Sequence, residues 1–211
     1  MSEETFRRYT SLPFLLDLLH KKQLALLDPS TWDDRNDAYF MEKYKEKKKL
    51  KTLLAICFAE SQETYQHWKI YSGNSSGVCI QFNKDSLLKK ALKIEGVRCQ
   101  KINYLPFRGK LDSVELLPFT KRVAFKGEKE FRIIYENKEE EIKIKYLPIT
   151  PDDIIRIAIN PWVNKSIYNS IVSTIRNIDG FSNIPTRKSG ILEYEKWKNK
   201  ADDVVVPKAK R

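Results

Sequence analysis

Hydrophobic residues near the start of the chain recur at the spacing of an amphipathic helix. The apolar face consists of Leu12, Leu15, Leu16 and Leu19. Ser11 before this face is a residue type that favours helix starts, and the basic residues 20–22 are typical of a helix end. The sequence therefore predicts a helix over residues 12–20, which follows a short strand at residues 6–9.

Compact β-like runs and short helical stretches alternate irregularly through the rest of the chain. Strands are expected at residues 53–58, 77–82, 97–104 and 154–159. A short helix is expected at residues 85–92, and turn-forming residues at 28–34 indicate a loop. Asn160 and Pro161 are typical of a helix start. The apolar stripe that follows them consists of Ile167, Ile171, Ile175 and Ile178.

Two later runs have the two-residue period of strands. One face of the first run carries Phe131, Ile133 and Tyr135, and one face of the second carries Ile142, Ile144 and Tyr146. The polar residues 137–140 separate the two runs. We therefore expect residues 129–135 and 141–147 to form an antiparallel β-hairpin, with Phe131, Ile133, Ile142 and Ile144 buried.

The order of the elements predicts one mixed α+β domain. No Gly/Ser-rich or Pro-rich linker divides the 211 residues, and no internal repeat or regular βα alternation is present. The expected fold is a mixed, mostly antiparallel sheet with short helices interspersed. A single domain is expected over 1–211, with its core at about 6–190 and a flexible basic tail at 200–211.

The charge of the chain favours a polyanionic partner. Thirty-nine Lys and Arg residues against 28 Asp and Glu residues give a net charge of +11. Nucleic acid or an acidic protein would be attracted, although lysines on exposed faces also serve solubility alone. The lysine-rich residues 43–51 can likewise be a solvated helical face or a phosphate-contacting patch, and a charge run alone favours the solvated face.

The start of the chain and its cysteines predict a cytoplasmic protein. The polar, charged residues 1–12 are in the wrong order for a signal peptide, and no apolar run approaches the length of a membrane span. Cys57, Cys79 and Cys99 form no CxxC pair and lie within apolar segments. Reduced, buried thiols are therefore expected, with no membrane partner and no disulfide framework.

Several standard sites are missing from the sequence. It contains no GxGxxG motif and no P-loop motif, and His20 and His67 do not have the spacing of a zinc ligand pair. If the chain is an enzyme, carboxylates and arginines must do most of the chemistry. No metal site is predicted.

The segment at residues 127–132 carries the strongest chemical signal. Strand alternation would place Glu128, Glu130 and Arg132 in one row, opposite Phe131. Two carboxylates and a guanidinium can polarise a sugar hydroxyl or stabilise an oxocarbenium ion. The same row can be the solvent-exposed face of a hairpin, and the pattern alone favours that interpretation.

Aromatic residues give a second, weaker signal. Tyr65, Trp68 and Tyr71 recur every three residues through a polar stretch, and Arg7, Arg8 and Tyr9 add cations and a ring at the first strand. Such a stripe belongs more often to a core than to a ligand platform.

Read together, these residues resemble the bacterial domain-of-unknown-function family DUF2971. The matching pieces follow one another in order from Phe6 to about Ser189. They are residues 6–11, Trp32, Asp33, Asp34, Cys57, Phe58, Trp68, Tyr71, residues 77–80, Phe82, Tyr104, Phe125, Glu128, Glu130, Arg132 and Ser189.

The chain also resembles the ADP-ribosyltransferases, which split NAD and transfer ADP-ribose. An Arg on the first strand, a central aromatic segment and a Glu-x-Glu on a late strand carry this resemblance. It implies that Glu130 acts on the nicotinamide ribose, Glu128 assists the acceptor and Arg8 holds phosphate. It also implies a ring from Tyr71 or Trp68 against the nicotinamide. The other expected contributors to NAD binding are Tyr9 and Arg132.

Three functions are compatible with these patterns. The first is an NAD-dependent ADP-ribosyltransferase-like effector, a toxin or anti-phage defence component acting on nucleic acid or a nucleic-acid-associated protein. The second is a metal-dependent nuclease built on Glu141 and Lys143 of a strand. The third is a non-catalytic nucleic-acid-binding module that uses residues 43–51, the basic tail, Trp68 and Tyr71. Convergence of Arg8, Tyr71 and Glu130 on one cleft would favour the first.

Overall fold

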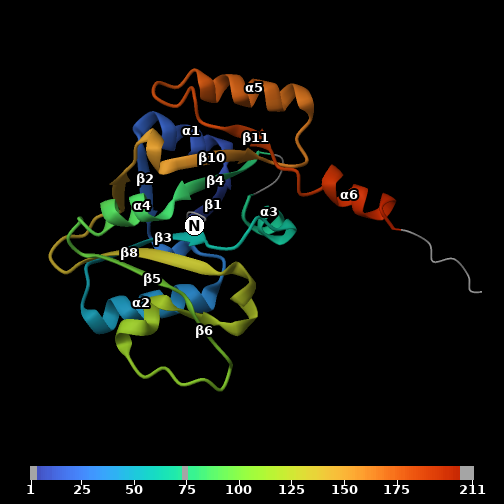
Figure 1. Ribbon diagram of the computed structural model, residues 1–211. Helices are drawn as coiled ribbons and strands as arrows, with labels where there is room; N and C mark the ends of the chain where they lie inside the picture. Colours follow the sequence, from blue (N-terminus) through green and yellow to red (C-terminus); the bar gives the residue numbers. More distant parts are fainter. Residues whose placement is uncertain (1–3, 73–75, 205–211) are drawn as a thin grey trace, which may run out of the picture.

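The computed structural model describes residues 4–72 and 76–204 (Figure 1). Its strands are β1 (Thr5–Ser11), β2 (Gln23–Leu27), β3 (Thr52–Ala59), β4 (Gly77–Asn83), β5 (Val97–Lys101), β6 (Asn103–Leu105), β7 (Thr120–Arg122), β8 (Glu130–Asn137), β9 (Ile144–Pro148), β10 (Ile154–Ile159) and β11 (Thr186–Lys188). Its α-helices are α1 (Leu12–Lys21), α2 (Arg35–Lys48), α3 (Tyr65–Tyr71), α4 (Lys84–Ala91), α5 (Lys165–Arg176) and α6 (Glu195–Asp202). Its 3-10 helices are η1 (Pro29–Thr31), η2 (Val114–Phe119), η3 (Val123–Glu128) and η4 (Pro151–Asp153). Within these residues, no helix is long and apolar enough to cross a lipid bilayer.

The larger sheet has two halves that meet at β3. Strands β11, β10, β4 and β1 form one half, and β3, β8 and β5 form the other, with β2 and β9 beside them. β3 and β8 pair along eight residues, from Thr52 opposite Asn137 to Ala59 opposite Glu130. By contrast, β1 meets β3 at the single pair Arg7 and Ala59. All pairs in this sheet are antiparallel except β10 with β11, so the predicted mixed, mostly antiparallel α+β fold is confirmed.

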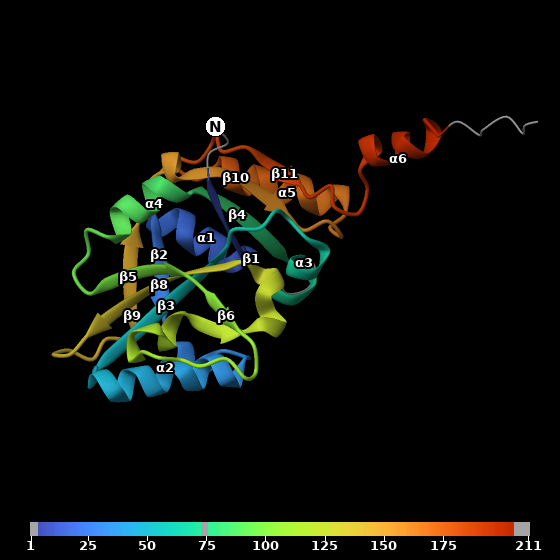
Figure 2. The same cartoon turned by 60° about the horizontal axis from the view of Figure 1, so that its bottom comes forward.

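Two hydrophobic clusters cover opposite faces of β3. Because side chains alternate along a strand, Leu54 and Ile56 enter the cluster under α1, α4 and α5, whereas Leu53 and Ala55 enter the cluster under α2. Figures 1 and 2 show α2 on one side of β3 and β8 and α5 on the other. The strand pair β3 and β8 is therefore buried on both faces.

The predicted N-terminal helix is confirmed as α1, and the predicted loop before α2 contains the short turn η1. The side chain of Asp34 caps α2 by accepting hydrogen bonds from the amides of Asn36 and Asp37. The lysine-rich residues 43–48 form the last turns of this helix, which ends at Lys49 in a left-handed conformation. This cap fixes Asp37 in the first turn of α2, where it faces the interior.

The predicted β-hairpin is wrong. Both edges of β8 are occupied, one by β3 and the other by β5, so no edge remains for the next strand. β9 crosses instead to β2, where Gln23 pairs with Pro148 and Leu27 with Ile144. Phe131 and Ile133 are buried as expected, whereas Ile142 is half-buried and Ile144 is 41% exposed.

Two predicted boundaries also change. The helix expected from Asn160 begins at Lys165, because the side chain of Asn164 accepts the hydrogen bond from the amide of Ile167. Ile167 is half-exposed, while Ile171, Ile175 and Ile178 are buried. α6 extends to Asp202, into the segment expected to be a flexible tail, and residues 205–211 of that tail lie outside the described residues.

Candidate active site

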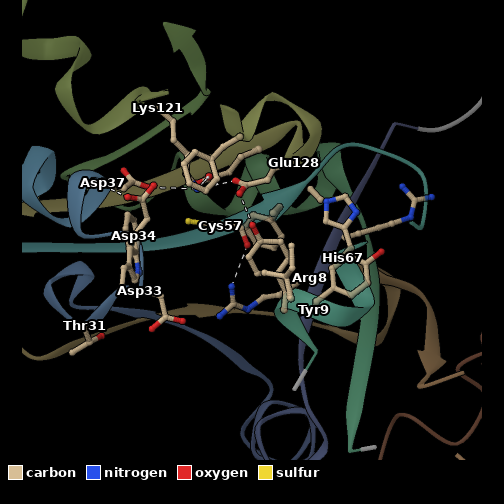
Figure 3. Close-up of a pocket in the computed structure, with 18 residues that line it drawn as sticks. Arg8, Tyr9, Thr31, Asp33, Asp34, Asp37, Cys57, His67, Lys121 and Glu128 are labelled. Carbon is tan, nitrogen blue, oxygen red and sulfur yellow. Dashed lines mark hydrogen bonds and ion pairs between the residues drawn. The ribbon is translucent and has the colours of Figure 1, made fainter. Parts of the chain in front are cut away.

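A pocket of about 450 Å³ lies where β1 and β3 separate (Figure 3). Arg7, Arg8 and Tyr9 of β1 form one wall, and the loop before α2 contributes Trp32, Asp33 and Asp34. α3 contributes His67 and Tyr71. The remaining wall comes from Lys121, Phe125, Glu128 and Glu130. Arg8, Tyr71 and Glu130 thus lie around the same pocket, although 63 residues separate the first two in the sequence and 59 the last two.

The carboxylates of Glu128 and Glu130 share one lysine. The ammonium of Lys121 lies 2.7 Å from Oε2 of Glu128 and 3.2 Å from Oε2 of Glu130. Burial would lower the pKa of Lys121, but Glu130, Glu128 and Asp37 outweigh burial and raise it. The ammonium therefore stays charged between the two carboxylates.

The pKa values of the two glutamates move in opposite directions. Burial raises the pKa of Glu128, which the bonds from Lys121 and Tyr71 offset only in part. Burial acts on Glu130 in the same sense, but Arg132 and Lys121 outweigh it and hold the pKa below its usual value. The surroundings thus favour the charged carboxylate at Glu130, whereas burial makes Glu128 easier to protonate.

Glu128 and Glu130 were expected to lie in one row along a single strand, but the backbone between them turns. Glu128 is the last residue of η3, Lys129 adopts a left-handed conformation with φ 45°, and Glu130 is the first residue of β8. The turn at Lys129, rather than a continuous strand, places both carboxylates beside Lys121. Glu130 is 6% exposed, so the expected solvent-exposed face is wrong.

Arg132 lies beneath the pocket and not in it. Its guanidinium is fully buried and donates two hydrogen bonds to Asp37, at 2.7 and 3.0 Å, and one from Nε to Glu130 at 2.8 Å. These carboxylates, together with the carbonyl of Pro118, occupy its donors. The expectation that Arg132 binds NAD is therefore corrected: it positions Glu130.

The aromatic wall consists of Tyr9, His67 and Tyr71. The rings of Tyr9 and His67 stack at 5.2 Å, and the hydroxyl of Tyr71 donates a hydrogen bond to Glu128. Burial lowers the pKa of His67, so this imidazole favours its neutral form. Tyr71 is 41% exposed and lines the pocket, so its side chain remains available to a ligand.

Trp68 does not line this pocket, which corrects its expected place at the nicotinamide. Residues three apart on a helix differ by about 60° in direction, so Tyr65 and Tyr71 flank the direction of Trp68. Trp68 itself is 1% exposed and packs with Cys79 and Ala158 against the sheet. Of the aromatic stripe Tyr65, Trp68 and Tyr71, the central residue therefore belongs to the core, as the pattern alone favoured.

The guanidinium of Arg8 has donors to spare. Its Nη1 donates to the carbonyl of Cys57 at 3.1 Å, and among residues 4–72 and 76–204 it has no ion-pair partner. Burial lowers the pKa of Arg8. Arg7, in contrast, donates to the carbonyl of Ser61 at 2.8 Å and to the side chain of Gln62 at 3.1 Å. Arg8 is thus the guanidinium that can grip an anion in this pocket.

Lys121, Asp37 and His67 are among the pocket residues to which sequence patterns gave no role. Lys121 is one of many lysines and belongs to no motif, so nothing in the sequence marks it. Asp34 is a residue type that favours helix starts, and it could have drawn attention to Asp37. A helix that starts after Asp34 places Asp37 in its first turn, which limits the directions in which that side chain can point.

The segment proposed for a nuclease is not on a strand. Glu141 and Lys143 lie exposed in the connection between β8 and β9. No cluster of His, Cys, Asp and Glu suited to a metal ion occurs in the part of the chain that the structure describes. Cys57 and Cys99 are half-buried, Cys79 is buried, and all three are free thiols.

No protein-family model and no curated protein matches the chain, so the resemblance to DUF2971 stays a prediction. A solved structure of Thermus sp. 2.9 DarT in complex with NAD+ is similar in fold, with a TM-score of 0.51 at 10% sequence identity over 92% of this chain and 99% of that one. Another, Thermus sp. 2.9 DarT in complex with ADP-ribosylated ssDNA, has a TM-score of 0.49 at 12% identity over 92% and 98% of the two chains. Only the first structure supports a fold assignment, because the TM-score of the second is below 0.5. The chain therefore shares the mixed α+β fold of that DarT structure.

Proposed function

We propose that this chain is an NAD-dependent ADP-ribosyltransferase that acts on nucleic acid or on a nucleic-acid-associated protein. The observation that carries the proposal is the placement of Arg8, Tyr71 and Glu130 around one pocket. The fold is shared with a DarT structure whose bound ligand is NAD+. The volume of about 450 Å³ lies within the range of small-molecule sites.

NAD binding is assigned to the β1 and α3 walls. Arg8 has free guanidinium donors for the pyrophosphate, which it can grip through two parallel hydrogen bonds. The exposed ring of Tyr71 supplies a surface for the nicotinamide, and Tyr9 lies behind it on the same wall.

Glu130 is assigned to the nicotinamide ribose. As the bond between C1′ and the nicotinamide nitrogen breaks, its electron pair leaves with neutral nicotinamide and positive charge develops on the ribose. A carboxylate held charged by Arg132 and Lys121 stabilises that charge without reorganising. The bond from Arg132 keeps the carboxylate in place throughout.

Glu128 is assigned to the acceptor. An oxygen or nitrogen nucleophile of the acceptor attacks C1′ and loses a proton, which Glu128 accepts. Burial raises its pKa, which makes the carboxylate a better proton acceptor. The products are nicotinamide, the ADP-ribosylated acceptor and one proton on Glu128.

The net charge of +11 supports nucleic acid or a protein bound to it as the acceptor. Covalent attachment of ADP-ribose to a nucleic acid would block its use as a template. A toxin or an anti-phage defence component in the cytoplasm would act in this way.

The test follows nicotinamide release and label transfer from adenine-labelled NAD to oligonucleotides and to cell extract. Glu130→Gln keeps the hydrogen bond to Arg132 but removes the charge, so the rate should fall by about 10²-fold or more. Glu139→Gln, an exposed carboxylate after β8, is the matched control and should react like the parent. Equal rates for Glu130→Gln and the parent would remove Glu130 from the mechanism. No product from any protein would favour the non-catalytic binding module.

A further inference from the structure

A second pocket, of about 660 Å³, is lined by residues of β10, β11 and the end of α5. Figure 1 shows these three elements side by side. Three arginines line it: Arg156 from β10, Arg176 from the last turn of α5 and Arg187 from β11. The rest of the lining consists of the polar residues Ser182, Asn183 and Thr186 and the apolar residues Ile155, Ile184 and Pro185. None of the residues around this arginine pocket is aromatic.

The three guanidinium groups have no ion-pair partner among residues 4–72 and 76–204. Glu63 is the carboxylate that acts on Arg156, and it already accepts a hydrogen bond from Ser189. Burial, followed by repulsion from Arg187 and Arg7, lowers the pKa of Arg156. Uncompensated like charges destabilise a fold, so their convergence indicates that an anion completes the pocket.

The strand register connects the arginine pocket with the candidate active site. Arg156 is directly opposite Gln81 of β4, and Gln81 is directly opposite Arg7 of β1. Directly opposed residues project from the same face of a sheet, and two strand spacings separate Arg156 from Arg7 by about 10 Å. Arg187 is opposite Ala158, two residues from Arg156, and therefore shares this face. Arg7 in turn lines the pocket that holds Arg8 and Glu130.

We propose that Arg156, Arg176 and Arg187 bind backbone phosphates of a single-stranded nucleic acid, whose adjoining nucleotides reach the candidate active site. The proposal deepens the proposed function and rests on it for the fate of the bound strand. Guanidinium groups suit phosphates, and a lining without aromatic rings suits the backbone rather than the bases. A single strand is required because a base inside a duplex cannot reach a reactive atom in a pocket.

The test is binding of a fluorescent single-stranded oligonucleotide of about 12 nucleotides, by anisotropy at several salt concentrations and without NAD. The full chain carries Glu130→Gln throughout, so that no transfer can occur. Adding Arg156→Gln and Arg187→Gln should weaken binding about fivefold or more. The slope of log affinity against log salt concentration should also become less steep by roughly 1.4, which is about 0.7 for each phosphate that is no longer neutralised.

Two controls separate this site from general electrostatics. Lys45→Gln with Lys47→Gln removes the same charge from α2, at the far end of the molecule in Figures 1 and 2, and should leave the slope unchanged. Arg187→Lys keeps the charge and should retain the slope. Melting temperatures show whether each variant is folded, and Arg176→Gln, at the end of α5, provides a second test if Arg156→Gln is unstable.

Equal losses from the α2 pair and the arginine pair would overturn the proposal, as would an unchanged slope in the arginine variants. Pyrophosphate binding that depends on these arginines, together with oligonucleotide binding that does not, would mean that the pocket takes free phosphates, which also overturns the proposal. The enzyme hypothesis is measured separately. Loss of binding in a protein without transferase activity would leave the site standing, and transfer without arginine-dependent binding would leave the activity standing.

Discussion

The hydroxyl of Tyr71 on α3 donates a hydrogen bond to the carboxylate of Glu128 at the end of η3. Lys121 contacts the other oxygen of the same carboxylate. Burial raises the pKa of Glu128, whereas both contacts lower it. The tyrosine therefore has a second role besides offering a ring: it helps to keep Glu128 charged.

Tyr71→Phe should shift the pH dependence of the reaction. The variant keeps the ring but raises the pKa of Glu128 further, so the acidic limb of kcat/KM should move to higher pH. The KM for NAD should stay within about twofold, because the ring remains. Nicotinamide release, measured between about pH 5 and 9, reports both. Tyr65→Phe on the same helix is the control, and an unshifted profile for Tyr71→Phe would exclude Glu128 as the proton acceptor.

Arg132→Met should destabilise the fold strongly. It leaves the buried carboxylates of Asp37 and Glu130 without their guanidinium, a change expected to lower the free energy of unfolding by about 3–5 kcal/mol. Arg122→Met removes an exposed guanidinium 3.9 Å from Asp34 and should change it by less than about 1 kcal/mol. Urea unfolding measures both. Similar midpoints for the two variants would contradict the buried network.

Glu130 should contribute stability that depends on pH. Its pKa in the folded protein lies below the ordinary value of 4.5, so the contribution is fully present above that value and is lost as the pH falls through the folded-state pKa. The difference in unfolding free energy between the parent and Glu130→Gln should be constant near neutral pH and shrink in acid. Urea unfolding at a series of pH values measures it. A difference that grows in acid would mean that the pKa is raised instead.

Ile133→Ala tests the placement of β8. Ile133 is fully buried between β3 and β5, so the substitution should lower the unfolding free energy by about 2–5 kcal/mol. Ile144 would be equally buried in the hairpin that the sequence predicts, but it is 41% exposed on β9. Ile144→Ala should therefore change stability by less than about 1 kcal/mol. Equal losses of stability at Ile133 and Ile144 would contradict the placement of β9 and support the predicted hairpin.

Local patterns predicted the elements well, because the period of apolar residues is a local property. The helix over residues 12–20 and the strand at 154–159 both formed. The hairpin failed because residues far away in the sequence, on β3 and β5, take both edges of β8. A two-residue period indicates that a strand exists, but it does not identify the strands beside it.

In the candidate site, too, local sequence signals were predictable and long-range contacts were not. Chemistry and resemblance singled out Arg8, Glu128 and Glu130, and the structure places all three around one pocket. Glu130 also belongs to the fold, because it is buried with Arg132 and Lys121. Lys121 could not be predicted, because only the tertiary fold brings it between the two carboxylates.

The single residue pair between β1 and β3 has a consequence for the pocket. Arg8 and Tyr9 belong to one half of the sheet, and Glu130 belongs to the other. Since Arg7 opposite Ala59 is the one pairing between β1 and β3 in the described residues, a slight opening or closing there would alter the distance between Arg8 and Glu130. In the proposed mechanism, NAD affinity and turnover would therefore both depend on this single contact, and a core substitution that shifts one half of the sheet would change both together.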